Sequence, residues 1–231
     1  MRTGRARWRN VCEHLAVRFL AEPANSLSDA LLGAVSLGAA AALGRPGTAD
    51  PAFTACLGAM GSAAAWGAVH HALITPTSRL RSRSWTAIAT MLAGGIGFLF
   101  AASARATLPA PTARQVAPLG AIGPAVYLAF AASGRRDMNT MVAAQGLSMA
   151  GVVGMWIAAT ARRQQGASLG LTAVVLSAAA TAARSIPPSA LAKVKLDPDS
   201  AYHLAQIPGV LVLACAARGV TPYRQPVPYP A

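Results

Sequence analysis

Polar side chains that can do chemistry collect near the ends of three hydrophobic segments. They comprise carboxylates, imidazoles, an amide and a hydroxyl: Glu22, Asn25, Ser28, Asp29, His70, His71, Asp199 and His203. Two or three imidazoles plus a carboxylate match the ligands that zinc prefers. A further carboxylate can orient a ligating histidine or activate a water molecule. A polar group in hydrocarbon is costly, so its presence there calls for a function or a partner.

Residue spacing places several of these groups on common helix faces. Asp199 and His203 are four residues apart, so they share a face of one helix. Glu22, Asn25 and Ser28 or Asp29 are also spaced for one face. A purely structural interpretation stays open. Histidines near a membrane surface often only hydrogen-bond, Asp199 can cap the last helix, and Ser28 or Asp29 can cap or pair within the first.

Composition predicts the class of protein that positions these residues. Of 231 residues, 54% are apolar and only 12% are charged, which is typical of a polytopic membrane protein. The net charge of +13 would suggest nucleic-acid binding in a soluble protein, but here the arginines fall between hydrophobic segments, so membrane orientation explains them better and no nucleic-acid partner is expected. Cys12, Cys56 and Cys215 lack CxxC spacing, so no disulfide framework is expected.

The hydrophobic segments predict an all-α, seven-helix transmembrane bundle. A span needs about 20 apolar residues, and breaks rich in charge, proline or glycine separate seven candidates: 26–44, 53–74, 85–104, 115–133, 138–161, 167–184 and 199–217. The predicted organisation is a basic N-terminal segment (1–25), a membrane domain (26–218) and a proline-rich tail (219–231).

The distribution of basic residues predicts the orientation. Of the 20 Lys and Arg residues, 13 fall on the side of the N-terminus and 7 on the other. The positive-inside rule therefore places the N-terminus in the cytoplasm of a multi-pass plasma-membrane protein. Span one starts, span two ends and span seven starts on this same side. The polar residues are thus expected at one membrane face, whichever way the protein is oriented.

The opening stretch resembles the CREST superfamily of seven-span membrane hydrolases, which includes the alkaline ceramidases and the adiponectin and progestin receptors. Alkaline ceramidases have a Cys-Glu pair and then Ala-Glu-x-x-Asn-x-x-Ser entering the first span. Here "CE" is Cys12-Glu13, and "AEPANSLS" supplies Glu22, Asn25 and Ser28. The closing "DPDSAYHLAQIPGVLVL" is similar in position to the last span of the family.

The resemblance implies a zinc site and a calcium site. In the family, a histidine ending span two and an HxxxH motif opening span seven bind zinc, and His71 (or its neighbour His70) and His203 fall at two of these positions. Asp199 stands where the motif has its first histidine, and Gly67 stands where the family has a serine if His71 is the equivalent. The calcium site of the ceramidases corresponds to the segment of Glu13, Glu22 and Asn25.

Three functions follow as alternatives. The first is a metal-dependent hydrolase of a membrane lipid amide or ester, in which His71, Asp199 and His203 hold zinc. Asp29 or Ser28 would then serve as proton shuttle or oxyanion donor. The second is a non-catalytic sensor or partner subunit with a degraded site. The third, a small transporter, is least favoured because charged mid-span residues and an inverted repeat are lacking. Substrate and oligomeric state are left open.

Overall fold

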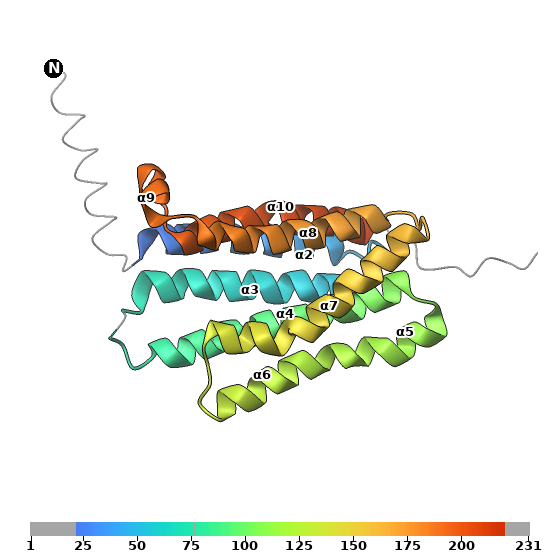
Figure 1. Ribbon diagram of the computed structural model, residues 1–231, viewed down its shortest axis with the longest axis horizontal. Helices are drawn as coiled ribbons and strands as arrows, with labels where there is room; N and C mark the ends of the chain where they lie inside the picture. Colours follow the sequence, from blue (N-terminus) through green and yellow to red (C-terminus); the bar gives the residue numbers. More distant parts are fainter. Residues whose placement is uncertain (1–21, 76, 220–231) are drawn as a thin grey trace, which may run out of the picture.

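The computed structural model describes residues 22–75 and 77–219, and these form helices and connecting loops without a strand. Helices and short 3₁₀ turns (η) follow in the order α2 Pro23–Leu43, α3 Pro51–Leu73, α4 Arg81–Thr107, α5 Ala110–Val116, η1 Ala117–Ala121, α6 Ile122–Ala132, α7 Met138–Ala161, α8 Ala167–Ala182, η2 Ala183–Ser185, α9 Pro188–Leu191, η3 Ala192–Val194 and α10 Pro198–Gly219. Figure 1 shows the long helices running roughly side by side.

Seven helical segments of this part of the chain are long and apolar enough to cross a membrane, which confirms the predicted seven-span bundle. The fourth span comprises α5, η1 and α6, and η1 interrupts its α-helix at Pro118. Several helices begin a few residues before the predicted spans. The third begins at Arg81 instead of residue 85, because a helix can extend beyond the hydrocarbon into the polar interface, where arginine is well solvated.

Local chemistry explains where the helices begin. The Asp50 carboxylate accepts a hydrogen bond from the amide of Ala52 and caps α3, and Asp137 caps α7 in the same way through Thr140. Asp197 caps α10, because its Oδ1 accepts hydrogen bonds from the backbone amides of the second and third residues of that helix. The capping role that was one alternative for Asp199 therefore belongs to Asp197.

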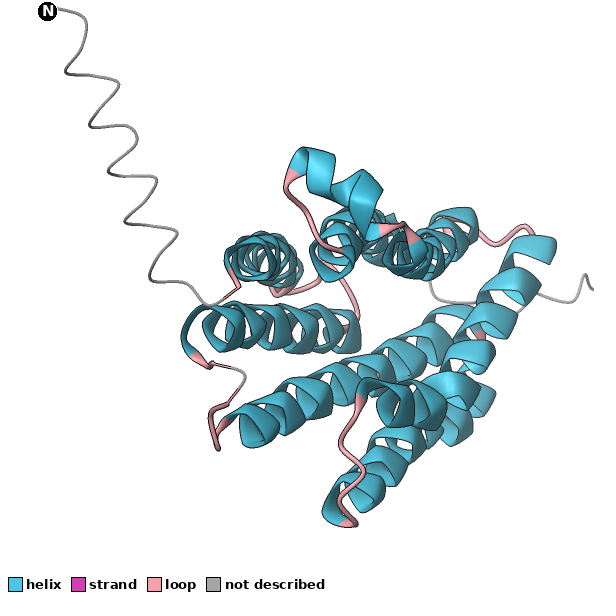
Figure 2. Cartoon of the chain, turned by 60° about the vertical axis from the view of Figure 1, so that its left-hand side comes forward, coloured by secondary structure: helices cyan, strands magenta, loops and turns pink. Residues whose placement is uncertain are grey.

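Small residues allow the spans to approach closely. An added Cβ at Gly33 of α2 would lie 3.0 Å from the backbone nitrogen of Ala65 of α3, so the two backbones are nearly in contact there. Around this pair, α10 packs against α2 and α8, and α4 packs against α3 and α7. Figure 2 shows the bundle turned, with α8 and α10 above and the fourth span below. The start of α2, the end of α3 and the start of α10 meet at one end (Figure 1).

Candidate functional site

Asp29 of α2 lies between two imidazoles that come from two other spans. Its Oδ1 is 3.3 Å from Nδ1 of His203 in α10, and its Oδ2 is 3.7 Å from Nε2 of His71 in α3. The Asp29 side chain is only 7% exposed, and the imidazoles of His71 and His203 are 12% and 15% exposed. A buried carboxylate flanked by two imidazoles is the centre of the acid–base cluster, the name used below for Glu22, Ser28, Asp29, His71 and His203.

Glu22 holds His71 in place from the outer side. Its Oε2 lies 2.5 Å from Nδ1 of His71, and its Oε1 accepts a 2.9 Å hydrogen bond from Arg81 at the start of α4. Partial burial by itself raises the pKa of Glu22, but the hydrogen bonds of Arg81 and His71 outweigh it and hold the pKa below its ordinary value. Glu22 is therefore an ionised acceptor for Nδ1–H, and Nε2 of His71 is directed at Asp29.

Ser28 holds His203 from the inner side. Its hydroxyl donates to the carbonyl oxygen of Asn25 at 3.1 Å, and its Oγ lies 3.1 Å from Nδ1 of His203. Because the hydroxyl proton is used on Asn25, Nδ1 of His203 must be the donor toward Ser28. The side-chain Oδ1 of Asn25 accepts a 2.8 Å hydrogen bond from the hydroxyl of Ser200, and this bond joins α2 to α10 beside the cluster.

His71, and not its neighbour His70, belongs to this cluster. His70 points toward α4, where its Nδ1 lies 2.9 Å from Oγ of Ser84, and Ser84 also accepts a 3.0 Å hydrogen bond from Trp66. Successive residues of a helix point about 100° apart, so adjacent histidines reach different neighbours. The sequence leaves open which of the two histidines faces the other polar residues, and in the structure it is His71 that contacts Asp29.

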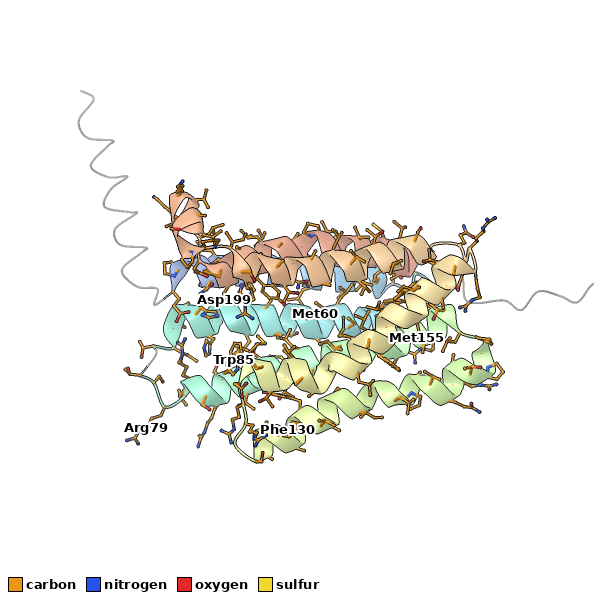
Figure 3. The ribbon with its side chains drawn as sticks, viewed as in Figure 1. Met60, Arg79, Trp85, Phe130, Met155 and Asp199 are labelled. Atoms are coloured by element: carbon orange, nitrogen blue, oxygen red, sulfur yellow. The ribbon has the colours of Figure 1, made fainter. Side chains whose placement is uncertain are left out.

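Asp199 lines the same pocket as His70 and His71, but it pairs with none of the other predicted ligands. Its Oδ1 is 2.6 Å from a guanidinium nitrogen of Arg184, and both side chains are well exposed. His203 instead has Asp29 as its carboxylate neighbour. Figure 3 shows that Asp199 and Trp85 lie toward the same end of the bundle.

The four predicted metal ligands are not gathered around one point. Within residues 22–75 and 77–219, no group of three or more histidine, cysteine, aspartate and glutamate side chains is arranged to hold a metal ion. The zinc ligand set of His70, His71, Asp199 and His203 therefore stays a prediction. For calcium, both oxygens of Glu22 contact His71 and Arg81, and Glu13 lies outside the described residues.

Gly67 makes room for the Asp29 carboxylate. An added Cβ at Gly67 of α3 would collide with Oδ2 of Asp29 and lie 3.0 Å from its Cγ. Sequence comparison marked Gly67 only as a departure from the serine of the CREST pattern. Arg81 is not among the predicted site residues, and the only sequence signal for its ion pair with Glu22 is that both residues are expected on the same side of the membrane.

A polar pocket of about 790 Å³ adjoins the cluster at this end of the bundle. It extends from the start of α10 and the end of α3 across the start of α4 to the loop before α7, and its lining includes Glu22, His70, His71, Arg81, Trp85, Asp137 and Asp199. The pocket gives both Glu22 and His71 access to a molecule at the membrane surface.

Comparison with known proteins identifies a family without assigning a function. Residues 24–222 match a family of unknown function, DUF6962. The chain belongs to the DUF6962 family. The matched segment contains Asn25, Ser28, Asp29, His71 and His203, and it begins just after Glu22. No curated protein and no solved structure matches this DUF6962 chain.

Proposed function

We propose that this DUF6962 protein is a membrane hydrolase of lipid amide or ester bonds and a distant relative of the CREST superfamily. The observation that carries the proposal is the buried Asp29 carboxylate between His71 and His203, which come from two other spans. Glu22 and Ser28 each position one imidazole. Positioned acid–base groups in a partly dehydrated site are what general acid–base catalysis requires.

The hydrogen-bond pattern indicates that the cluster binds a positive charge. Glu22 accepts a hydrogen bond from Nδ1–H of His71. In a neutral His71 the other ring nitrogen, Nε2, is then unprotonated, and its lone pair points at Oδ2 of Asp29. Two acceptors facing each other repel, and a proton or a metal ion between them relieves the repulsion.

Zinc is the metal whose preferences this donor set meets. Two ligand atoms that share a tetrahedral zinc ion at about 2.0–2.2 Å lie roughly 3.4 Å apart. The 3.7 Å between Oδ2 of Asp29 and Nε2 of His71 is close to this separation. Nδ1 of His203 carries a proton toward Ser28, so its 3.3 Å separation from Oδ1 of Asp29 is not one between two zinc ligands. Oδ2 of Asp29, Nε2 of His71 and Nε2 of His203 would hold the ion, and because no three such side chains among the described residues are placed to hold a metal as they lie, the ion would have to draw them together. Zinc would supply electrophilic polarisation of a water and a carbonyl.

The side chains of the cluster would position the imidazoles and transfer the protons. Glu22 keeps His71 in one tautomer, and Ser28 keeps Nδ1–H of His203 directed into the cluster. Oδ1 of Asp29, the oxygen that is not assigned to the ion, would accept a proton from the attacking water and return it to the leaving amine or alcohol. The pocket beside His71 and Trp85 would admit the lipid head group.

Hydrolysis tests this proposal directly. Purified protein would be assayed with a long-chain ceramide and a lysophospholipid, and release of fatty acid would be quantified by mass spectrometry. Wild type should release fatty acid, and Asp29→Asn should lose roughly 100-fold or more of the rate, because it removes the proton acceptor at nearly constant volume. Ser36→Ala is the matched control, since Ser36 is buried in the same helix with no hydrogen-bond partner for Oγ among the described residues. Equal rates for Asp29→Asn and wild type would refute a catalytic role for the cluster.

A non-catalytic seven-span protein, either a sensor or a partner subunit, is the second candidate. Asp199 favours it, because the residue at the position of the first histidine of HxxxH pairs with Arg184 on the exposed surface. On this alternative the cluster serves only to tie α2, α3 and α10 together, and no substrate turns over.

The seven spans make this a multi-pass membrane protein, and we propose the plasma membrane with the N-terminus in the cytoplasm. Leu80→Cys and Gln164→Cys would be made in a chain whose Cys12, Cys56 and Cys215 are replaced by alanine. In intact cells, a membrane-impermeant maleimide should label position 164 and spare position 80 until the membrane is broken. Labelling of position 80 and not of position 164 in intact cells would show that the protein has the opposite orientation.

A further inference from the structure

An apolar groove of about 810 Å³ lies at the end of the bundle opposite the acid–base cluster. Its walls are the start of α3, the second half of α4 and the fourth span around η1, which Figure 1 shows near one another. The lining consists almost entirely of alanine, glycine, proline and one phenylalanine, including Ala55, Gly94, Gly97, Phe98, Ala117 and Pro118. These small residues leave a space that larger side chains would fill.

Two arginines line the same groove where the spans reach the membrane surface. Arg105, at the end of α4, is paired with Asp50 by two hydrogen bonds of 2.7 and 3.0 Å, so its charge is balanced. Arg114 of α5 is exposed and has no ion-pair partner among residues 22–75 and 77–219. The groove therefore combines a long apolar wall with one uncompensated positive charge.

We propose that this groove binds one acyl chain of an anionic phospholipid whose phosphate pairs with Arg114. An apolar cavity is a poor site for water, and within a bilayer the available apolar occupant is a lipid chain. Guanidinium forms strong bidentate hydrogen bonds with phosphate. A zwitterionic lipid offers the same chain, but its own cation offsets the attraction to Arg114.

Lipid retention through detergent purification tests the proposal. Protein purified from vesicles of equimolar phosphatidylglycerol and phosphatidylcholine would be extracted, and the bound lipid quantified by mass spectrometry. Wild type should retain phosphatidylglycerol in preference. Arg114→Gln should weaken its retention about tenfold, the effect of losing one charged hydrogen-bond partner. Arg45→Gln, at an exposed arginine near the same end, should retain lipid like wild type.

A second variant tests the groove itself. An added Cβ at Gly94, which lines the groove, meets no atom within 4 Å, so the side chain of Gly94→Leu starts in open space. It should occupy part of the groove and also abolish the preferential retention. Gly146→Leu adds the same side chain at an exposed position of α7 and is the control. Helical circular dichroism should be unchanged in all variants.

Three results would overturn the proposal. They are equal retention of both lipids by wild type, an Arg114→Gln variant that retains phosphatidylglycerol normally, and a Gly94→Leu variant that still does so. None of these outcomes depends on whether the acid–base cluster is catalytic.

Discussion

Asp29→Ala is expected to destabilise the protein by about 3 kcal/mol and to abolish hydrolysis. The side chain is 7% exposed and faces His71 and His203. Removing one member of a buried charged group typically costs 3–5 kcal/mol, and we expect the lower end because both imidazoles can become neutral. Thermal melting in detergent, followed by intrinsic fluorescence, measures the change.

The control for Asp29→Ala is a second truncation in the same helix. Ser36 is fully buried, and its Oγ has no hydrogen-bond partner in the described part of the chain. Ser36→Ala removes that unsatisfied hydroxyl, so the melting temperature should stay the same or rise. If both variants melt like wild type, Asp29 contributes nothing to the contacts between the spans.

Gly67→Ala should disrupt the cluster without altering any ionisable residue. The new Cβ would collide with Oδ2 of Asp29 and force the carboxylate away from His71. Overpacking of this kind costs about 1–3 kcal/mol, and loss of the carboxylate position should lower hydrolysis as strongly as Asp29→Asn. Melting temperature and fatty-acid release report the two effects separately.

Gly58→Ala is the matched substitution, nine residues earlier in α3. An added Cβ there meets no atom within 4 Å, so the better helix propensity of alanine should leave stability unchanged or raise it by up to about 1 kcal/mol. Should Gly67→Ala behave like Gly58→Ala in both assays, the Asp29 carboxylate does not occupy the place described above.

The spans and their common polar end were predictable, because both follow from local properties. Charge-free runs of about 20 residues define membrane helices, and the parity of the spans places Asp29, His71 and His203 at one face. The number of spans and the convergence of these residues from α2, α3 and α10 agree with the structure.

The partners within that end were not predictable, because they depend on how the helices rotate against each other. His70 is adjacent to His71, and only the position of Ser84 on α4 decides that His70 turns away. The spacing of Asp199 and His203 indicates a shared helix face, but Arg184 of η2, at the end of the sixth span, pairs with Asp199. Gly67 is important because it leaves space for the Asp29 carboxylate of another helix. A contact between two helices of this kind leaves no recognisable pattern in the sequence around either residue.

Zinc content is the measurement that tests the central claim most directly. Wild type and His203→Ala would be purified in parallel without chelators, and zinc per chain would be determined by elemental analysis alongside the melting temperature. The account predicts about one zinc ion per wild-type chain, the number one catalytic site holds. In His203→Ala most of the zinc should be lost while the helical content is kept, because alanine is a good helix former. Folded wild-type protein that contains no zinc would contradict the zinc-dependent hydrolase and favour the non-catalytic alternative.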